Sequence, residues 1–286
     1  MHTPIFVIAS LFGLIPSITW GAVINLSPGD LSAPTNSYWV ISGSYTNAEY
    51  NGIYSVGVSD KTKRLEHQEY TLGLTRFYKS LFGMPAFISA SLPSHSLNQS
   101  KDGISANGIG DLGVGIGIWP HLDRKTKESF GVGISMTHPT GEYDSSKTLN
   151  SGENRIRYNA LLRYRSPMVD SYWSEITLQK NWVGDNSNFG GSTISTDPAF
   201  AISAFIAKRG KNFSSYFIGL EKNYAGKTYL NNASINSGQE DYRVHLGWRQ
   251  AISSSTELVL RTSKTLKIDR GYNQSEWFQL AINRRF

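Results

Sequence analysis

The sequence predicts an all-β fold, a transmembrane antiparallel up-and-down β-barrel of about twelve strands that follows a cleaved signal peptide. Three observations predict it. Apolar and polar residues alternate with a period of two, the connections alternate between short and long, and the last segment ends in phenylalanine. The mean hydropathy of −0.31 is that of a water-soluble protein, but alternation cancels in any hydropathy average.

The N-terminus is expected to be a signal peptide over residues 1–21. The run PIFVIASLFGLIPSIT (4–19) is apolar and uncharged, and small residues stand at Thr19 and Gly21, where cleavage would occur. An uncleaved anchor is the alternative, although the run is short for a membrane span. Residues 22–36 then form a periplasmic or plug segment, and residues 37–286 form the barrel.

Most of the predicted strands show clear alternation. They are DLGVGIGIW (111–119), SFGVGISMT (129–137), NRIRYNALLRYR (154–165), SYWSEITLQKNW (171–182), SSYFIGLEKNY (214–224), QEDYRVHLGWRQ (239–250), STELVLRTS (255–263) and EWFQLAINRRF (276–286), with weaker strands near 37–46, 67–78, 85–93 and 197–208. Their lengths match the ~9–11 residues with which a tilted strand crosses a bilayer.

The connections alternate in length. Short ones lie at 80–85, 166–170, 208–212 and 251–255, and an intermediate one at 120–128 falls where a short one is due. Long ones lie at 94–108, 139–153, 184–196 and 225–239. Outer-membrane barrels require this order, because their periplasmic turns are short and their outer loops are long.

The segment 154–165 fixes which face of its strand meets lipid. Arginines stand at odd positions, and the even positions are mostly apolar. An arginine facing lipid near the bilayer midplane would cost roughly 2–4 kcal/mol. The arginines must therefore face the lumen.

The same reasoning gives a predicted inward set. It comprises Arg155, Arg157, Arg163, Arg165, Glu175, Gln179, Asp241, Arg243, His245, Arg249, Glu257, Arg261 and Arg285. One interpretation is a basic solute pathway that favours anionic or aromatic compounds, because guanidinium groups bind carboxylates and stack on rings. The other is a ladder of salt bridges that braces the wall, because acids alternate with bases on these strands. A barrel of this size has a narrow pore, or one plugged by residues 22–36 or by a folded loop.

The last strand carries the pattern expected of an assembly signal. Phe278, Leu280, Ile282 and the terminal Phe286 share one face. We expect the barrel-assembly machinery, outer-membrane lipid and lipopolysaccharide as partners, in the outer membrane of a Gram-negative bacterium. Trp182, Trp248, Tyr164 and Tyr224 are expected in the interfacial aromatic girdles.

The outer loops place charged residues at the mouth of the barrel: Glu142, Asp144, Glu153, Asp185 and Lys227. The acids of PTGEYD and SGENR could bind calcium. Such residues more often form turns and hydrogen-bond their own backbone.

Other function classes have weak support. A lipid hydrolase would use pairs such as His95 with Ser96, or His138 near Ser135, but His95 is expected in a loop and no third orienting group has a matching spacing. The six histidines show no ligand spacing for zinc, and there is no cysteine. We therefore expect no enzyme, no metal, no cofactor and no nucleic acid.

Several motifs occur in the order known from one bacterial family: GDLGVGIGIWP, THPTGEYD, NSGENR, VGDNSNFG and STDPAF. The chain resembles the outer-membrane transporter family named after the meta-cleavage pathway of phenol degradation, over about residues 37–286. The resemblance implies a β-barrel associated with uptake of aromatic or other hydrophobic compounds. The chain departs from the family at Ala225, Gly226 and Lys227, where a glycine pair and an acid are usual, and at Ile156, where an aromatic is frequent.

We therefore expect a channel or transporter that passively passes or binds a small, hydrophobic or aromatic and potentially anionic solute. The alternative is a non-conducting barrel, either a lipid-modifying hydrolase or a structural protein.

Overall fold

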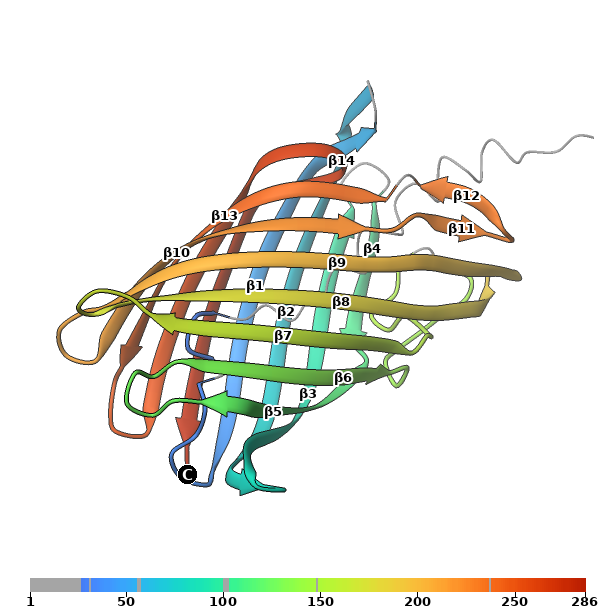
Figure 1. Cartoon of the computed structure of the whole chain (residues 1–286). Helices are drawn as coiled ribbons and strands as arrows, with labels where there is room; N and C mark the ends of the chain where they lie inside the picture. Colours follow the sequence, from blue (N-terminus) through green and yellow to red (C-terminus); the bar gives the residue numbers. More distant parts are fainter. Residues whose placement is uncertain (1–26, 31, 56–57, 100–102, 148, 237) are drawn as a thin grey trace, which may run out of the picture.

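The chain folds into a closed antiparallel barrel of 12 strands (Figure 1). The computed structural model describes residues 27–30, 32–55, 58–99, 103–147, 149–236 and 238–286, so the predicted signal peptide lies outside the described residues. Fourteen strand segments are numbered, because β14 forms two strands of the wall, β4 and β5 together form one, and β11 and β12 form a short hairpin outside the count of 12. They are β1 (Tyr38–Ser55), β2 (Val58–Leu81), β3 (Met84–Gln99), β4 (Ile104–Ile109), β5 (Leu112–Leu122), β6 (Ser129–His138), β7 (Arg157–Pro167), β8 (Tyr172–Phe189), β9 (Ser192–Arg209), β10 (Ser214–Ala225), β11 (Thr228–Leu230), β12 (Ala233–Asn236), β13 (Gln239–Ala251) and β14 (Thr256–Arg285). The predicted fold class is confirmed.

The barrel closes through β14, which is long enough to form two strands of the wall. Residues 257–270 of β14 pair with β13, and residues 271–285 pair with β1. Trp39 and Phe286 exchange backbone hydrogen bonds of 3.1 and 2.9 Å, which seal the two ends of the barrel sequence together. β4 and β5 likewise form one strand of the wall. β4 pairs with residues 94–99 of β3, β5 pairs with residues 86–91 of β3, and Gly110 lies between β4 and β5.

The alternation predicted for the wall is present in β7. Tyr158, Leu162 and Tyr164 are 40–50% exposed on the outer face. Arg157, Leu161 and Arg163 on the other face are 3–6% exposed. Because closed strands satisfy each other's backbone groups, this wall can meet lipid on one face while charged side chains fill the inside. No helix in the described part of the chain has the length and hydropathy to cross a bilayer.

Three of the four predicted long loops contain strands: two are continuations of wall strands and one holds a separate hairpin. β8 and β9 run on to a tight turn at Gly190 and Gly191, both with positive φ, while β3 continues as far as Gln99 and pairs with β4. The third contains the short hairpin of β11 and β12. The prediction failed because strands that project beyond the bilayer meet water on both faces, so alternation stops while the backbone pairing continues.

Aromatic rings lie on inward-facing glycines of neighbouring strands. A Cβ at Gly117 would lie 2.3 Å from the ring of Phe87, and one at Gly219 would lie 2.2 Å from the ring of Phe205. The same holds for Gly247 beneath Phe217, at 2.1 Å. The lumen-facing glycines therefore give the interior rings the space that a methyl group would occupy.

Candidate functional site: the barrel interior

The structure places most of the predicted inward set inside the barrel. Arg155, Arg157, Arg163, Glu175, Gln179, Asp241, Arg243, His245 and Arg261 are all buried. Arg165, Arg249 and Glu257 are half-buried, and Arg285 is exposed beside the chain terminus. These groups do not form one site, because most of them belong to three separate clusters.

The first cluster holds the N-terminal segment against β7 and β8. Glu175 Oε1 accepts hydrogen bonds from the backbone N–H of Gly29 and from Trp173 Nε1, each at 3.0 Å. Arg163 forms an ion pair with Glu175 and donates to the carbonyl oxygen of Ser27 at 3.2 Å. The segment therefore docks on charged side chains rather than on an apolar patch.

On the opposite side of the N-terminal segment, β13 and β14 supply the contacting side chains. Arg249 forms an ion pair with Asp30, and its Nη1 donates to Glu257 Oε1 at 2.6 Å. Asn283 Nδ2 also donates to Glu257 Oε1, at 3.0 Å. Residues 27–30 thus bridge β8 and β13 across the inside of the barrel. Asp30 lies in a segment without periodicity, so its ion pair could not be predicted from sequence.

The second cluster lies on β10, β13 and β14. Asp241 accepts from Arg243 at 2.9 Å and from Asn223 at 3.0 Å. His245 lies 3.7 Å from Glu221 and 3.1 Å from Arg261. Glu221 was not predicted as an inward acid, although its alternation with Asn223 on one face of β10 contained that information.

The third cluster is formed by residues 139–147 and 149–156 of the outer loop, which lie at the mouth of the barrel. Asp111 accepts hydrogen bonds from the backbone N–H groups of Gly141 and Glu153, at 2.8 and 2.9 Å. Gly141 and Gly152 lie so close that a Cβ on Gly152 would fall 2.7 Å from a backbone carbon of Gly141. The loop residues of the family motifs THPTGEYD and NSGENR therefore form a compact structure at the outer mouth of the barrel.

Ion pairs with arginines hold the C-terminal end of this loop in place. Arg157 Nε donates to Glu153 Oε2 at 2.5 Å, and Arg155 lies 3.5 Å from the same oxygen. Burial opposes ionisation of Glu153, but Arg157 and then Arg155 outweigh it and lower the pKa of that carboxyl. Burial raises the pKa of Asp111, against the hydrogen bonds that its carboxylate accepts. Arg155 also donates to Thr196 Oγ1 at 3.1 Å, which ties the loop to β9.

The remaining outer-mouth residues do not converge. Glu142 and Asp144 are exposed, and Asp144 accepts from the backbone N–H of Ser146 at 2.9 Å, as a turn residue does. Asp185 is exposed on β8, and Lys227 is exposed between β10 and β11. The structure therefore brings together no set of these acids that could bind calcium.

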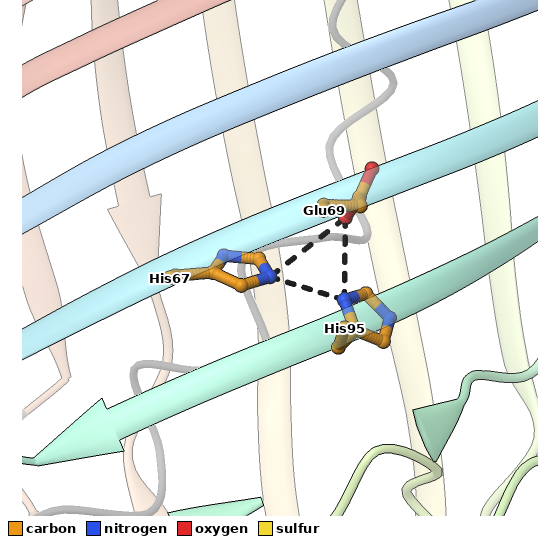
Figure 2. A group of neighbouring side chains, drawn as sticks. All are labelled: His67, Glu69 and His95. Carbon is orange, nitrogen blue, oxygen red and sulfur yellow. Dashed lines mark hydrogen bonds and ion pairs between the residues drawn. The ribbon is translucent and has the colours of Figure 1, made fainter. Parts of the chain in front are cut away.

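One further group lies near the outer end of β3, where it pairs with the middle of β2, and it was not predicted from sequence. His67, Glu69 and His95 face one another on the inner wall (Figure 2), and in the described part of the chain they are the one trio with metal-ligand spacing. His95 was expected in a loop, and it lies in β3. The missing information was the strand register, which places His95 directly opposite Glu69.

The C-terminal residues face outward. Phe278, Leu280, Ile282 and Phe286 are 37–61% exposed on the outside of the barrel. Trp182, Tyr164 and Tyr224 are also exposed there, and Trp248 is half-buried. The exposed rings have the placement of interfacial girdle residues.

Comparisons with known proteins agree with this architecture. The chain is similar to the COG4313 outer membrane channel from Pseudomonas putida F1, with a TM-score of 0.86, 19% identity, and coverage of 91% of this chain and 100% of that chain. It is similar to the β domain of the Bordetella autotransporter BrkA, with a TM-score of 0.54, 9% identity, and coverage of 88% and 100%. For the NanC porin these values are 0.50, 10%, 87% and 100%. These likenesses show an outer-membrane barrel fold, which channels and autotransporters share.

No curated protein matches the chain. The family model described as "Putative MetA-pathway of phenol degradation" matches residues 66–209, just over half of the chain. The chain belongs to this phenol-degradation family.

Proposed function

We propose that the protein is an outer-membrane channel that passively passes or binds a small aromatic or other hydrophobic solute, with a preference for anions. The arrangement of arginines over aromatic rings on the inner wall carries this proposal. The family description and the channel and porin structures of the same fold support it.

Guanidinium groups and rings occur together at three places on the inner wall. Arg165 lies 4.8 Å from the centre of the Trp173 ring, and Arg285 lies 4.4 Å from that of Tyr38. Arg261 lies between Phe205 and Trp277, at 5.5 and 5.2 Å. A planar cation beside a ring offers both a carboxylate fork and a stacking surface. Aromatic acids present both complementary groups.

The N-terminal segment is the proposed plug of this channel. Ser27, Pro28 and Pro34 are almost completely buried, and the seat of residues 27–30 consists of ion pairs and hydrogen bonds. Such a seat can exchange with water at a modest cost, because the released charges are rehydrated. We propose that its release opens the pathway.

The outer membrane, its lipids and lipopolysaccharide, and the barrel-assembly machinery are the surroundings and partners that we propose. The outward apolar face supports the first two. The exposed row that ends in Phe286 supports recognition during assembly. A hydrolase would need a serine beside an oriented histidine, whereas His95 Nδ1 faces His67 and Glu69.

The test is conductance of the folded barrel in planar bilayers, together with benzoate efflux from liposomes. We expect ion flow that favours chloride over potassium. Arg285→Gln should lower that preference and slow benzoate efflux, because Arg285 is exposed at the periplasmic mouth. The matched control is Lys208→Gln, which removes an exposed cation at the same end of the barrel and should leave both values unchanged.

A structural, non-conducting barrel is the second candidate, and the internal ion pairs favour it. Arg163–Glu175 joins β7 to β8 and Arg249–Glu257 joins β13 to β14, while Arg243–Asp241 is an ion pair within β13. A folded barrel that stays silent, even after removal of residues 22–36, would overturn the channel and support this bracing role.

A further inference from the structure

Three metal-ligating side chains meet near the outer end of β3, where it pairs with the middle of β2. Glu69 pairs directly with His95 in the antiparallel register, and His67 stands two residues before Glu69 on the same face of β2. Figure 2 shows all three side chains pointing toward one another. Side chains at positions i and i+2 of a strand share one face, and the directly opposed residue of the next strand joins them. Two adjacent strands thus supply three ligands without a loop.

The donor atoms form a triangle of the size that a metal ion needs. His67 Nε2 lies 3.0 Å from His95 Nδ1, His95 Nδ1 lies 3.5 Å from Glu69 Oε2, and His67 Nε2 lies 3.9 Å from the same oxygen. A point equidistant from these three atoms lies about 2.0 Å from each, which is the length of zinc–nitrogen and zinc–oxygen bonds. An ion slightly out of their plane would keep these lengths and approach a tetrahedral arrangement.

The surroundings hold the ligands in place and leave one side open. Thr71 Oγ1 donates to Glu69 Oε1 at 2.8 Å, so the second carboxylate oxygen is held while Oε2 faces the histidines. A Cβ at Gly110 would lie 2.6 Å from His95 Nε2, so the backbone there confines the ring. The side chains of His67, His95 and Glu69 remain 14–23% exposed, so ions in solution can reach them.

We propose that His67, Glu69 and His95 bind one divalent transition-metal ion of the zinc type, with a fourth position open to water or solute at the outer mouth. Two imidazoles and one carboxylate form a ligand set that zinc accepts in protein sites with an open position. A site at this place would put a fixed positive charge beside the loop cluster of Glu153 and Arg157. The proposal does not depend on conduction, because the ligands bind whether or not the barrel is open.

The test is direct zinc titration of the folded barrel, prepared without a histidine tag and stripped with a chelator. We expect one Zn²⁺ per barrel by calorimetry, and a rise in melting temperature that EDTA reverses. Co²⁺ in place of Zn²⁺ should give the visible absorption bands of four-coordinate cobalt. Glu69→Gln and His95→Gln, which preserve side-chain size, should each weaken Zn²⁺ binding at least about tenfold while the barrel remains folded.

The matched control is His138→Gln, because His138 is an exposed histidine at the outer end of β6 and takes no part in the cluster. It should bind Zn²⁺ as the unchanged barrel does. Two results would overturn the proposal: an unchanged barrel that takes up no Zn²⁺ at micromolar concentration, or cluster variants that bind as tightly as the control. In either case the pair is a histidine–histidine hydrogen bond of structural value.

Discussion

Glu175 on β8 accepts a hydrogen bond at 3.0 Å from the backbone N–H of Gly29, a residue 146 positions earlier in the chain. The other oxygen of the same carboxylate pairs with Arg163 on β7. One buried acid therefore joins two strands of the wall to the segment inside the barrel. Glu175 therefore contributes both to the stability of the wall and to holding residues 27–30 in the lumen.

Removing the acid should destabilise the barrel. Glu175→Ala leaves Arg163 buried without its carboxylate, and we expect a loss of about 3–5 kcal/mol of unfolding free energy in lipid vesicles. Changing Arg163 to Met as well should restore much of that loss, because no buried charge remains. Glu66→Ala, at an exposed position of β2, is the control. Equal losses in the two single variants would contradict the account.

The outer loop should open more often when Asp111, whose carboxylate accepts two hydrogen bonds from the loop, is changed. Asp111→Asn replaces one of two accepting oxygens by a donor that faces a backbone N–H, so two hydrogen bonds cannot both form. We expect trypsin to cleave after Lys147 about fivefold faster, because one lost hydrogen bond of this kind changes the local opening equilibrium by ~1 kcal/mol. Asp185→Asn, exposed at the same mouth, should be cleaved at the unchanged rate. Unchanged protection in Asp111→Asn would show that the loop is held elsewhere.

The sequence alone predicted the barrel, its strand number and the inward face of β7. It could do so because bilayer physics acts on every second residue, and Arg157 or Arg163 facing lipid is too costly. The outward row ending in Phe286 follows the same rule. The roles of the inward residues as a solute pathway stay a prediction.

Contacts between strands could not be predicted in the same way. The cluster of His67, Glu69 and His95 depends on the register of β2 against β3, and a one-residue slip would turn His95 outward. The seat of Asp30 depends on a segment without periodicity. The extended hairpin of β8 and β9 was missed because Asp185 and its polar neighbours resemble a loop when no lipid imposes alternation.

Aromatic rings on glycines should make the interior intolerant of a single methyl group. Gly219→Ala would place a Cβ 2.2 Å from the ring of Phe205. We expect a loss of about 1–3 kcal/mol in unfolding free energy, as overpacked cores show. Adding Phe205→Leu should recover part of the stability. The control is Gly43→Ala, because the atom nearest to the added Cβ would lie 3.8 Å away. Gly191→Ala is unsuitable as a control, because the φ of Gly191 is positive. If Gly219→Ala folds as stably as Gly43→Ala, the ring does not need that space.

Release of the proposed plug should be measurable in single-channel recordings. Asp30→Asn removes the ion pair with Arg249 while keeping the size of the side chain. We expect a higher open probability than in the unchanged barrel. Asp170→Asn, in an exposed periplasmic turn where asparagine tolerates the positive φ, should behave as the unchanged barrel does. The same open probability in both variants would remove the plug from the proposal.

The most direct test of the barrel itself uses the absence of cysteine from the chain. Spin labels on single cysteines at positions 88–92 of β3 would report the accessibility of each residue to oxygen dissolved in lipid. If β3 crosses the bilayer as part of a barrel wall, accessibility is high at Ile88, Ala90 and Leu92 and low at Ser89 and Ser91. A flat profile across the five positions, or maxima at the two serines, would contradict it.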